Sequence, residues 1–96
     1  MNSRNIGWWN EYDQLSLYGG NITFITDDGE DMIEIEYCDG MLIDVGKSSC
    51  DNFYYVTVVS SNDETGWKTP LMEIAVADKK YLIDQIQKAI LQFRLR

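Results

Sequence analysis

Carboxylates are the side chains of this sequence best suited to chemistry, because the chain contains no histidine. Without histidine the usual general base, the imidazole of a catalytic triad and the commonest metal ligand are all missing. Glu34, Glu36 and Asp44 remain as a pair or trio of carboxylates for general acid–base work. However, an open sheet in a chain of 96 residues leaves little room for a deep pocket. We therefore predict a protein that is not an enzyme.

Three other motifs suggest ligand sites, and each lacks a required part. The run Asp27-Asp28-Gly29-Glu30-Asp31 has the composition of a calcium loop but not its alternating ligands or its glutamate at position twelve. The segment Gly46-Lys47-Ser48 lacks the earlier glycine of a phosphate loop, since position 41 is Met. Cys38 and Cys50 have no Cys or His companion for zinc, so we expect free thiols. We predict no metal and no cofactor.

The elements that would position these residues are mostly strands. Alternation with a period of two, bounded by Gly, Asp, Asn and Ser, predicts strands over residues 21–26, 32–37, 41–45, 53–60 and 71–76. A weaker alternation over residues 15–18 suggests a sixth strand. The single proline, Pro70, suits the start of a strand or a sheet edge.

The chain after Val76 has the period of a helix. One apolar stripe at helical spacing is formed by Leu82, Ile83, Ile86, Ala89, Ile90 and Phe93. Asp78 is the expected N-cap, and Lys88, Arg94 and Arg96 lie toward the C-terminal end. The predicted fold is α+β, an antiparallel β-meander of about five strands with one C-terminal amphipathic helix packed on one face. We expect one domain over residues 1–96.

Two turns decide which side chains share a face of the sheet. The first turn can close with Asp28-Gly29 or with Gly29-Glu30, and either closure places Ile22 and Phe24 on the helix side and Ile25 on the other. For the second turn we predict a three-residue loop, Cys38-Asp39-Gly40, with Gly40 left-handed. This loop pairs Tyr37 with Met41, Ile35 with Ile43 and Ile33 with Val45. On the outer side it sets Glu34 opposite Asp44 and Glu36 opposite Leu42.

The negative charge is concentrated in one part of the chain. Residues 11–64 hold thirteen acids and one base, Lys47, a net charge of -12, whereas residues 65–96 have a net charge of +3. The total of -8 argues against a direct nucleic-acid partner. The sequence predicts like charges on adjoining strands. It also predicts exposed apolar side chains among them, namely Ile25, Leu42, Tyr55 and Val59. Such a surface suits the binding of a basic protein. The simpler alternative is a solvated face that serves solubility alone.

The sequence shows neither a membrane span nor an export signal. No run of about eighteen apolar residues is present. The first ten residues lack the apolar stretch of a signal peptide, and two cysteines suit a reduced compartment. We expect a cytoplasmic protein with no membrane association.

In its size, its acidic block from Glu11 to Glu64 and its α+β pattern, the chain resembles the small acidic immunity proteins of bacterial toxin systems, including contact-dependent growth inhibition. The resemblance is one of type, covers the whole chain and rests on no sequence motif. The resemblance implies a cytoplasmic, non-catalytic inhibitor whose partner is a basic toxin domain, a nuclease.

The charge pattern also indicates where a partner would bind. We predict a partner-binding surface made of Asp27, Asp28, Glu30, Asp31, Glu34, Glu36 and Asp44, with Tyr55 and the loop residue Trp67 as apolar anchors. The alternatives are a nucleic-acid mimic that inhibits a defence protein, a small intracellular protein-interaction domain, and a small carboxylate or metal-dependent enzyme. The oligomeric state stays open, because an edge strand after Pro70 can pair with a second copy.

Overall fold

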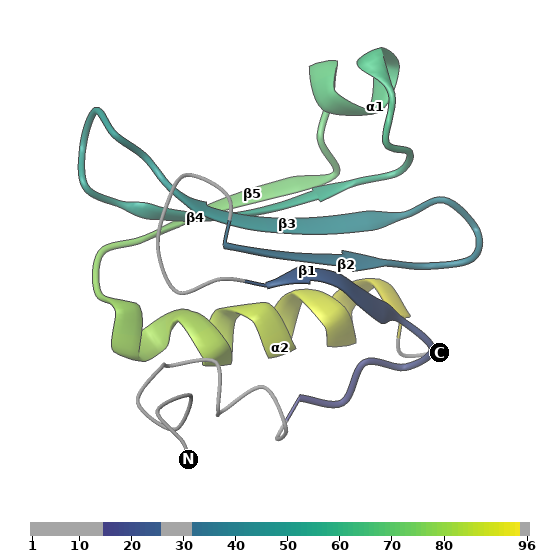
Figure 1. Cartoon of the computed structure of the whole chain (residues 1–96), viewed down its shortest axis with the longest axis horizontal. Helices are drawn as coiled ribbons and strands as arrows, with labels where there is room; N and C mark the ends of the chain where they lie inside the picture. The colour runs from purple at the N-terminus through teal and green to yellow at the C-terminus, as the bar shows by residue number, and fades with distance from the viewer. Residues whose placement is uncertain (1–14, 26–31, 95–96) are drawn as a thin grey trace.

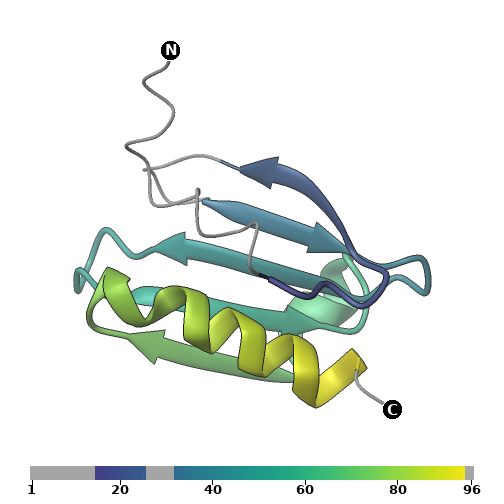
Figure 2. The same cartoon turned by 90° about the horizontal axis from the view of Figure 1, so that it is seen from below.

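The computed structural model describes residues 15–25 and 32–94, which form an antiparallel sheet with a helix across one face (Figure 1). The five strands lie side by side in chain order: β1 (Asn21–Ile25), β2 (Ile33–Glu36), β3 (Leu42–Lys47), β4 (Tyr54–Val59) and β5 (Met72–Val76). The helix α2 (Leu82–Arg94) contacts β4 and β5 and runs along the sheet (Figure 2). The predicted α+β meander with one C-terminal helix is confirmed.

The register between β2 and β3 is the one that the three-residue turn predicts. Ile33 pairs with Val45, Ile35 with Ile43, and Glu34 with Asp44. The Tyr37 N–H donates to the Met41 carbonyl at 2.9 Å, and Gly40 has a φ of +99°. Because that conformation is strained for residues with a Cβ, glycine at position 40 fixes the loop length and therefore the facing of both strands.

The register between β1 and β2 differs from the prediction beyond its first pairs. Ile22 pairs with Ile35, which agrees with their predicted place on one side, but an irregularity between Ile22 and Phe24 sets Phe24 opposite Glu34 and Ile25 opposite Ile33. The prediction that Ile25 and Ile33 lie on opposite sides of the sheet is therefore wrong, because one extra residue in β1 shifts the pairing and sets the two residues opposite each other. The turn of residues 27–31 lies outside the described residues.

Residues 15–18 do not form the suggested sixth strand; they lie beside α2 in an irregular conformation. The side-chain amide of Gln87 accepts from the Ser16 N–H at 2.8 Å and donates to the Ser16 carbonyl at 3.1 Å. This pair of bonds satisfies the backbone as a neighbouring strand would. Leu15 and Leu17 then pack against the core.

The core lies between the sheet and α2. Alternate residues of β2, β3 and β4 meet the apolar stripe of the helix, of which Leu82, Ile86, Ala89 and Ile90 are buried. Ile83 and Phe93 are partly buried against it, so the predicted stripe is confirmed. The Asp78 side chain accepts from the Lys80 N–H at 3.0 Å and caps a short 3₁₀ turn, Lys79–Tyr81, that leads into α2.

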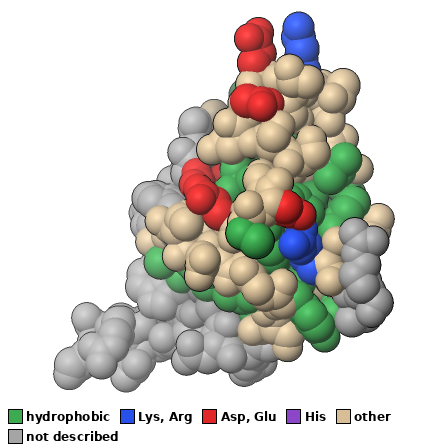
Figure 3. Space-filling view, turned by 90° about the vertical axis from the view of Figure 1, so that its right-hand side faces the viewer, with side chains coloured by type: hydrophobic (Ala, Val, Ile, Leu, Met, Phe, Trp, Pro, Cys, Tyr) green, Lys and Arg blue, Asp and Glu red, His purple; other side chains and the backbone are tan. Residues whose placement is uncertain are grey.

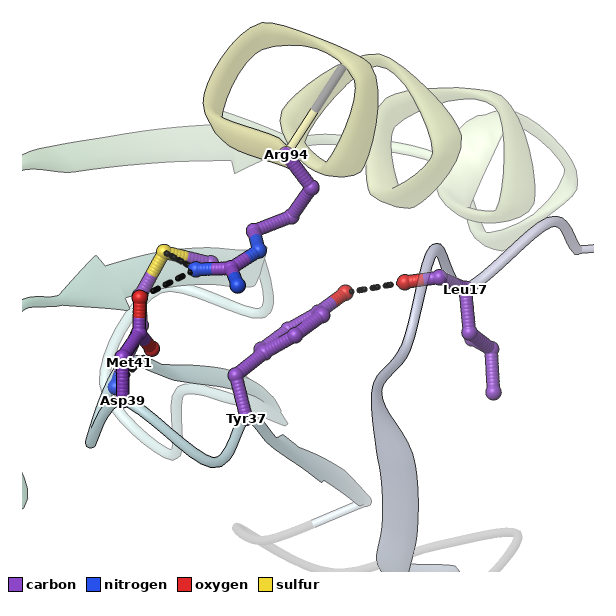
Figure 4. Close-up of polar contacts among 5 residues, drawn as sticks. All are labelled: Leu17, Tyr37, Asp39, Met41 and Arg94. Atoms are coloured by element: carbon purple, nitrogen blue, oxygen red, sulfur yellow. Dashed lines mark hydrogen bonds and ion pairs between the residues drawn. The ribbon is translucent and has the colours of Figure 1, made fainter. Parts of the chain in front are cut away.

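Arg94 joins the end of α2 to the turn between β2 and β3 (Figure 4). Its Nη1 donates to Asp39 Oδ2 at 2.8 Å, and its guanidinium lies 4.3 Å from the centroid of the Tyr37 ring. The Tyr37 hydroxyl donates to the Leu17 carbonyl at 2.8 Å. The Arg94 hydrogen bond lowers the pKa of Asp39. Arg94 thus connects α2 to the turn after β2 and, through Tyr37, to the segment before β1.

A short helix that the sequence did not predict, α1 (Glu64–Lys68), lies on the side of the sheet opposite α2 (Figure 1). The Asp63 carboxylate accepts from the Gly66 N–H at 2.8 Å and caps it. Trp67 therefore lies in a helix and not in a loop. Leu42 and Val59, which we expected to be exposed, are 1% and 0% exposed. They pair across β3 and β4 on the side where α1 lies, which makes the exposure prediction wrong for both.

Candidate protein-binding face

The sheet surface that α2 leaves uncovered is called the outer face here. Its residues alternate with the core residues along β2 to β5: Glu34, Glu36, Leu42, Asp44, Gly46, Tyr55, Thr57, Val59, Glu73 and Ala75. Four of these ten carry a carboxylate, and none carries a positive charge. The basic side chains of α2 and its 3₁₀ turn, by contrast, lie on the other layer of the molecule.

A row of three acidic residues and one threonine crosses the outer face. Glu34 pairs with Asp44, Asp44 with Thr57, and Thr57 with Glu73, so these residues of β2 to β5 stand side by side. We call Glu34, Asp44, Thr57 and Glu73 the acidic row. Like charges directly opposite one another, as in the first pair, destabilise a sheet by a few tenths of a kcal/mol or more. The acidic row therefore costs stability that a neutral row would not cost.

An open depression with a volume of about 470 Å³ lies on the outer face. Asp44, Thr57 and Glu73 of the acidic row line it, and Tyr55 and Trp67 contribute aromatic rings. Gly46, beside Tyr55 in the register, has no side chain to fill the space. Strands lie about 4.8 Å apart, so the backbones of Asp44 and Glu73 stand about 10 Å apart with the short Thr57 between them.

Hydrogen bonds from outside the depression hold its aromatic side chains. The Tyr55 hydroxyl donates to Asp51 Oδ2 at 2.5 Å, which lowers the pKa of Asp51 and raises the pKa of Tyr55. The Trp67 Nε1–H donates to Asn62 Oδ1 at 2.8 Å. Trp67 is nevertheless 40% exposed. Both rings are thus oriented before any ligand arrives, which lowers the entropy lost on binding.

Glu73 is also oriented by a neighbour within the acidic row. The hydroxyl of Thr57, a side chain that is 6% exposed, donates to Glu73 Oε2 at 3.3 Å. Lys47 is the basic residue at the depression, but its ammonium lies 5.9 Å from the centroid of the Tyr54 ring. Tyr54 packs against the core on the helix side of the sheet. Lys47 thus lines the depression and also contacts the Tyr54 ring.

The predicted partner-binding residues fall into three groups. Asp44, Tyr55 and Trp67 come together in the depression, and Glu34 and Glu36 lie on the same face without lining it. The remaining four, Asp27, Asp28, Glu30 and Asp31, lie outside the described residues. On the end of the molecule seen in Figure 3, acidic, basic and apolar side chains lie close together.

Sequence reasoning missed Glu73 and Thr57. Period-two alternation places Thr57 on the same side as Tyr55, and it places Glu73 on one face of the fifth strand. The register between β4 and β5 was not predictable, because α1 interrupts the connection. Without that register, nothing in the sequence sets Glu73 opposite Thr57.

The other motifs form no second site in the described part of the chain. Cys38 and Cys50 are free, exposed thiols, in the turns at opposite ends of β3. The Gly46-Lys47-Ser48 segment leaves β3 and enters a turn. Within residues 15–25 and 32–94, no group of three Cys, Asp or Glu side chains is placed to hold a metal ion.

Comparisons with protein-family models, with curated proteins and with solved structures found no match for this chain. None of the helices in the described ranges has the length and apolar character that crossing a bilayer requires.

Proposed function

We propose that this chain is a cytoplasmic immunity protein that binds a basic toxin domain, a nuclease, through its outer face and so inhibits it. The observation that supports the proposal most directly is the acidic row, which crosses four neighbouring strands on the face that α2 leaves uncovered. Immunity proteins of this type work by binding, so the proposal needs no catalytic group.

The charges and the aromatic rings supply different parts of such an interaction. A surface of one sign raises the association rate with an oppositely charged protein by about 10- to 1,000-fold at low salt. Pre-oriented aromatic side chains, here Tyr55 and Trp67, act as anchors that slow dissociation. A complex of standard size would cover about 800 Å² on each partner. That area exceeds the depression and takes in the rest of the acidic row.

A growth assay tests the function. Where the gene lies beside one for a large secreted protein with a basic C-terminal domain, that domain is expressed from an inducible promoter with and without this chain. We expect the domain alone to arrest growth and co-expression to restore it. Continued arrest despite formation of both proteins contradicts the proposal. Displacement of duplex DNA from unrelated cationic proteins would favour the nucleic-acid mimic instead.

A matched pair of variants tests the face. Glu34→Lys replaces a like-charged pair with an opposite-charged one, so the free energy of unfolding should rise by a few tenths of a kcal/mol. The same variant should slow association with the toxin domain severalfold and weaken its salt dependence. Asp84→Lys makes the same charge change on an exposed position of α2 and should leave association nearly unchanged. Equal effects of the two variants would refute the assignment of the outer face.

A further inference from the structure

The depression on the outer face has the composition of a site for a planar cation. Carboxylates of Asp44 and Glu73 lie on two sides of Thr57, and the rings of Tyr55 and Trp67 border the same space. A guanidinium group forms paired hydrogen bonds with carboxylates in its plane and stacks on aromatic rings with its face. The volume of about 470 Å³ lies within the range of roughly 300–1,000 Å³ that ligand pockets occupy.

The molecule already binds one guanidinium with the same chemistry at another place. Arg94 lies 4.3 Å from the centroid of the Tyr37 ring and donates to Asp39 at 2.8 Å (Figure 4). The Met41 sulfur lies 3.8 Å from Nη1 there, and one aromatic ring and one carboxylate contact the same arginine, which is 20% exposed. The depression offers two of each, and it is open to a side chain that comes from another molecule.

Charge complementarity decides which class of side chain fits. Two carboxylates of the acidic row, those of Asp44 and Glu73, line the depression and attract a cationic side chain. These carboxylates would repel an anionic side chain, and a neutral side chain would gain no charge interaction with them. A lysine would gain the charge interaction but not the planar stacking or the paired hydrogen bonds.

From these observations we infer that the outer face docks its protein partner by taking one arginine side chain of that partner into the depression, between the aromatic rings and against Asp44 and Glu73. This inference rests on the proposed function for the identity of the partner. The arginine site itself is a property of this chain alone. It makes an exposed arginine, and not general basicity, the feature that a partner must present.

The test is an NMR titration of the isotope-labelled chain with N-acetyl-arginine amide. The neutral N-acetyl-citrulline amide and the cationic N-acetyl-lysine amide are the comparison probes. We expect saturable shifts at Tyr55, Thr57 and the Trp67 indole N–H, with millimolar affinity. The citrulline probe should cause none, and the lysine probe should bind more weakly.

Variants locate the site. Trp67→Leu should weaken the affinity for the arginine probe about two- to fivefold, the range of a partly exposed cation–π contact, and Glu73→Gln should weaken it similarly. The controls are Phe53→Leu, at an exposed ring in the β3–β4 turn, and Asp84→Asn on α2, and both should bind as the wild type does. Spectra of the variants without probe show that each is folded.

Three results would overturn the inference: no shift at the depression, equal shifts with citrulline or lysine, or equal weakening by the control variants. Because no toxin enters this titration, its outcome is independent of the growth assay. If the chain binds arginine but does not restore growth, the immunity function is refuted and the arginine site is retained. Protection without arginine binding would refute the site and leave the function.

Discussion

Replacing Gly66 with alanine would test how closely α1 packs against the loop that precedes it. Gly66 is buried, and a Cβ built on it would lie 2.0 Å from the backbone oxygen of Ser61. Ordinary contacts begin at 3.4 Å, so the two would have to separate by about 1.4 Å. The obstacle is backbone and not the end of a flexible side chain, so α1 must shift or unwind, and Trp67 must move with it.

The expected cost follows from this overlap. Forcing extra atoms into a packed site costs about 1–3 kcal/mol, and the better helix propensity of alanine returns less than about 1 kcal/mol. For a domain of about 100 residues, each kcal/mol lowers Tm by about 4–8 °C. We therefore expect Gly66→Ala to lower Tm by about 5–15 °C. Local detachment of α1 would give the smaller value, because only the stability of that helix is then lost.

Thermal unfolding followed by circular dichroism measures Tm, and the indole N–H resonance of Trp67 reports the position of α1. Thr65→Ala is the matched control, since Thr65 is an exposed position of the same helix. We expect this control to leave both signals close to those of the wild type. An unchanged Tm together with an unchanged Trp67 resonance in Gly66→Ala would refute the packing argument.

Three further predictions concern a turn, a hydroxyl and a cap. Gly40→Ala should lower the free energy of unfolding by about 1–2 kcal/mol, because φ is +99°; Gly40→Asn should cost less, and equal costs in denaturant titrations would contradict this. Tyr37→Phe should cost about 1 kcal/mol and speed amide exchange beside Leu17, whose carbonyl loses its donor. Backbone hydrogen bonding to Gly66 lowers the pKa of Asp63, so its contribution is present above the ordinary value of 3.8 and is lost as pH falls through the lower folded pKa. Asp63→Asn keeps a capping oxygen and should reduce the loss of Tm in acid; an identical acid profile would exclude this role.

The sequence predicted those parts of the fold that depend on neighbouring residues. The loop Cys38–Gly40 has a length set by its glycine, and the alternation on both sides allows only one register that buries Ile33 and Ile35. The apolar stripe of α2 was predictable for the same reason, because it depends only on the spacing of residues within one helix. The irregularity after Ile22 has no comparable signal, because no glycine or turn residue marks it.

The candidate site was only partly predictable for the same reason. Asp44 and Tyr55 lie on adjacent strands, so alternation placed them on one face. Trp67 lies in α1, a helix of five residues whose main sequence signal is the single cap Asp63. Glu73 lies in β5, the strand that follows α1. Because α1 was not predicted, the position of Trp67 at the depression was not predicted either.

The contacts that close the core join residues far apart in the chain. Gln87 bonds to Ser16 across 71 positions, and Arg94 bonds to Asp39 across 55. All five strands therefore emerge from the ribosome before the helix that covers their apolar side. Until residues 82–94 have been synthesised, the apolar side chains on one face of the sheet remain exposed to solvent. Chaperones bind such exposed apolar surfaces, and aggregation begins at them. A chain interrupted within α2 would for this reason be a substrate for quality control and not a shorter folded protein.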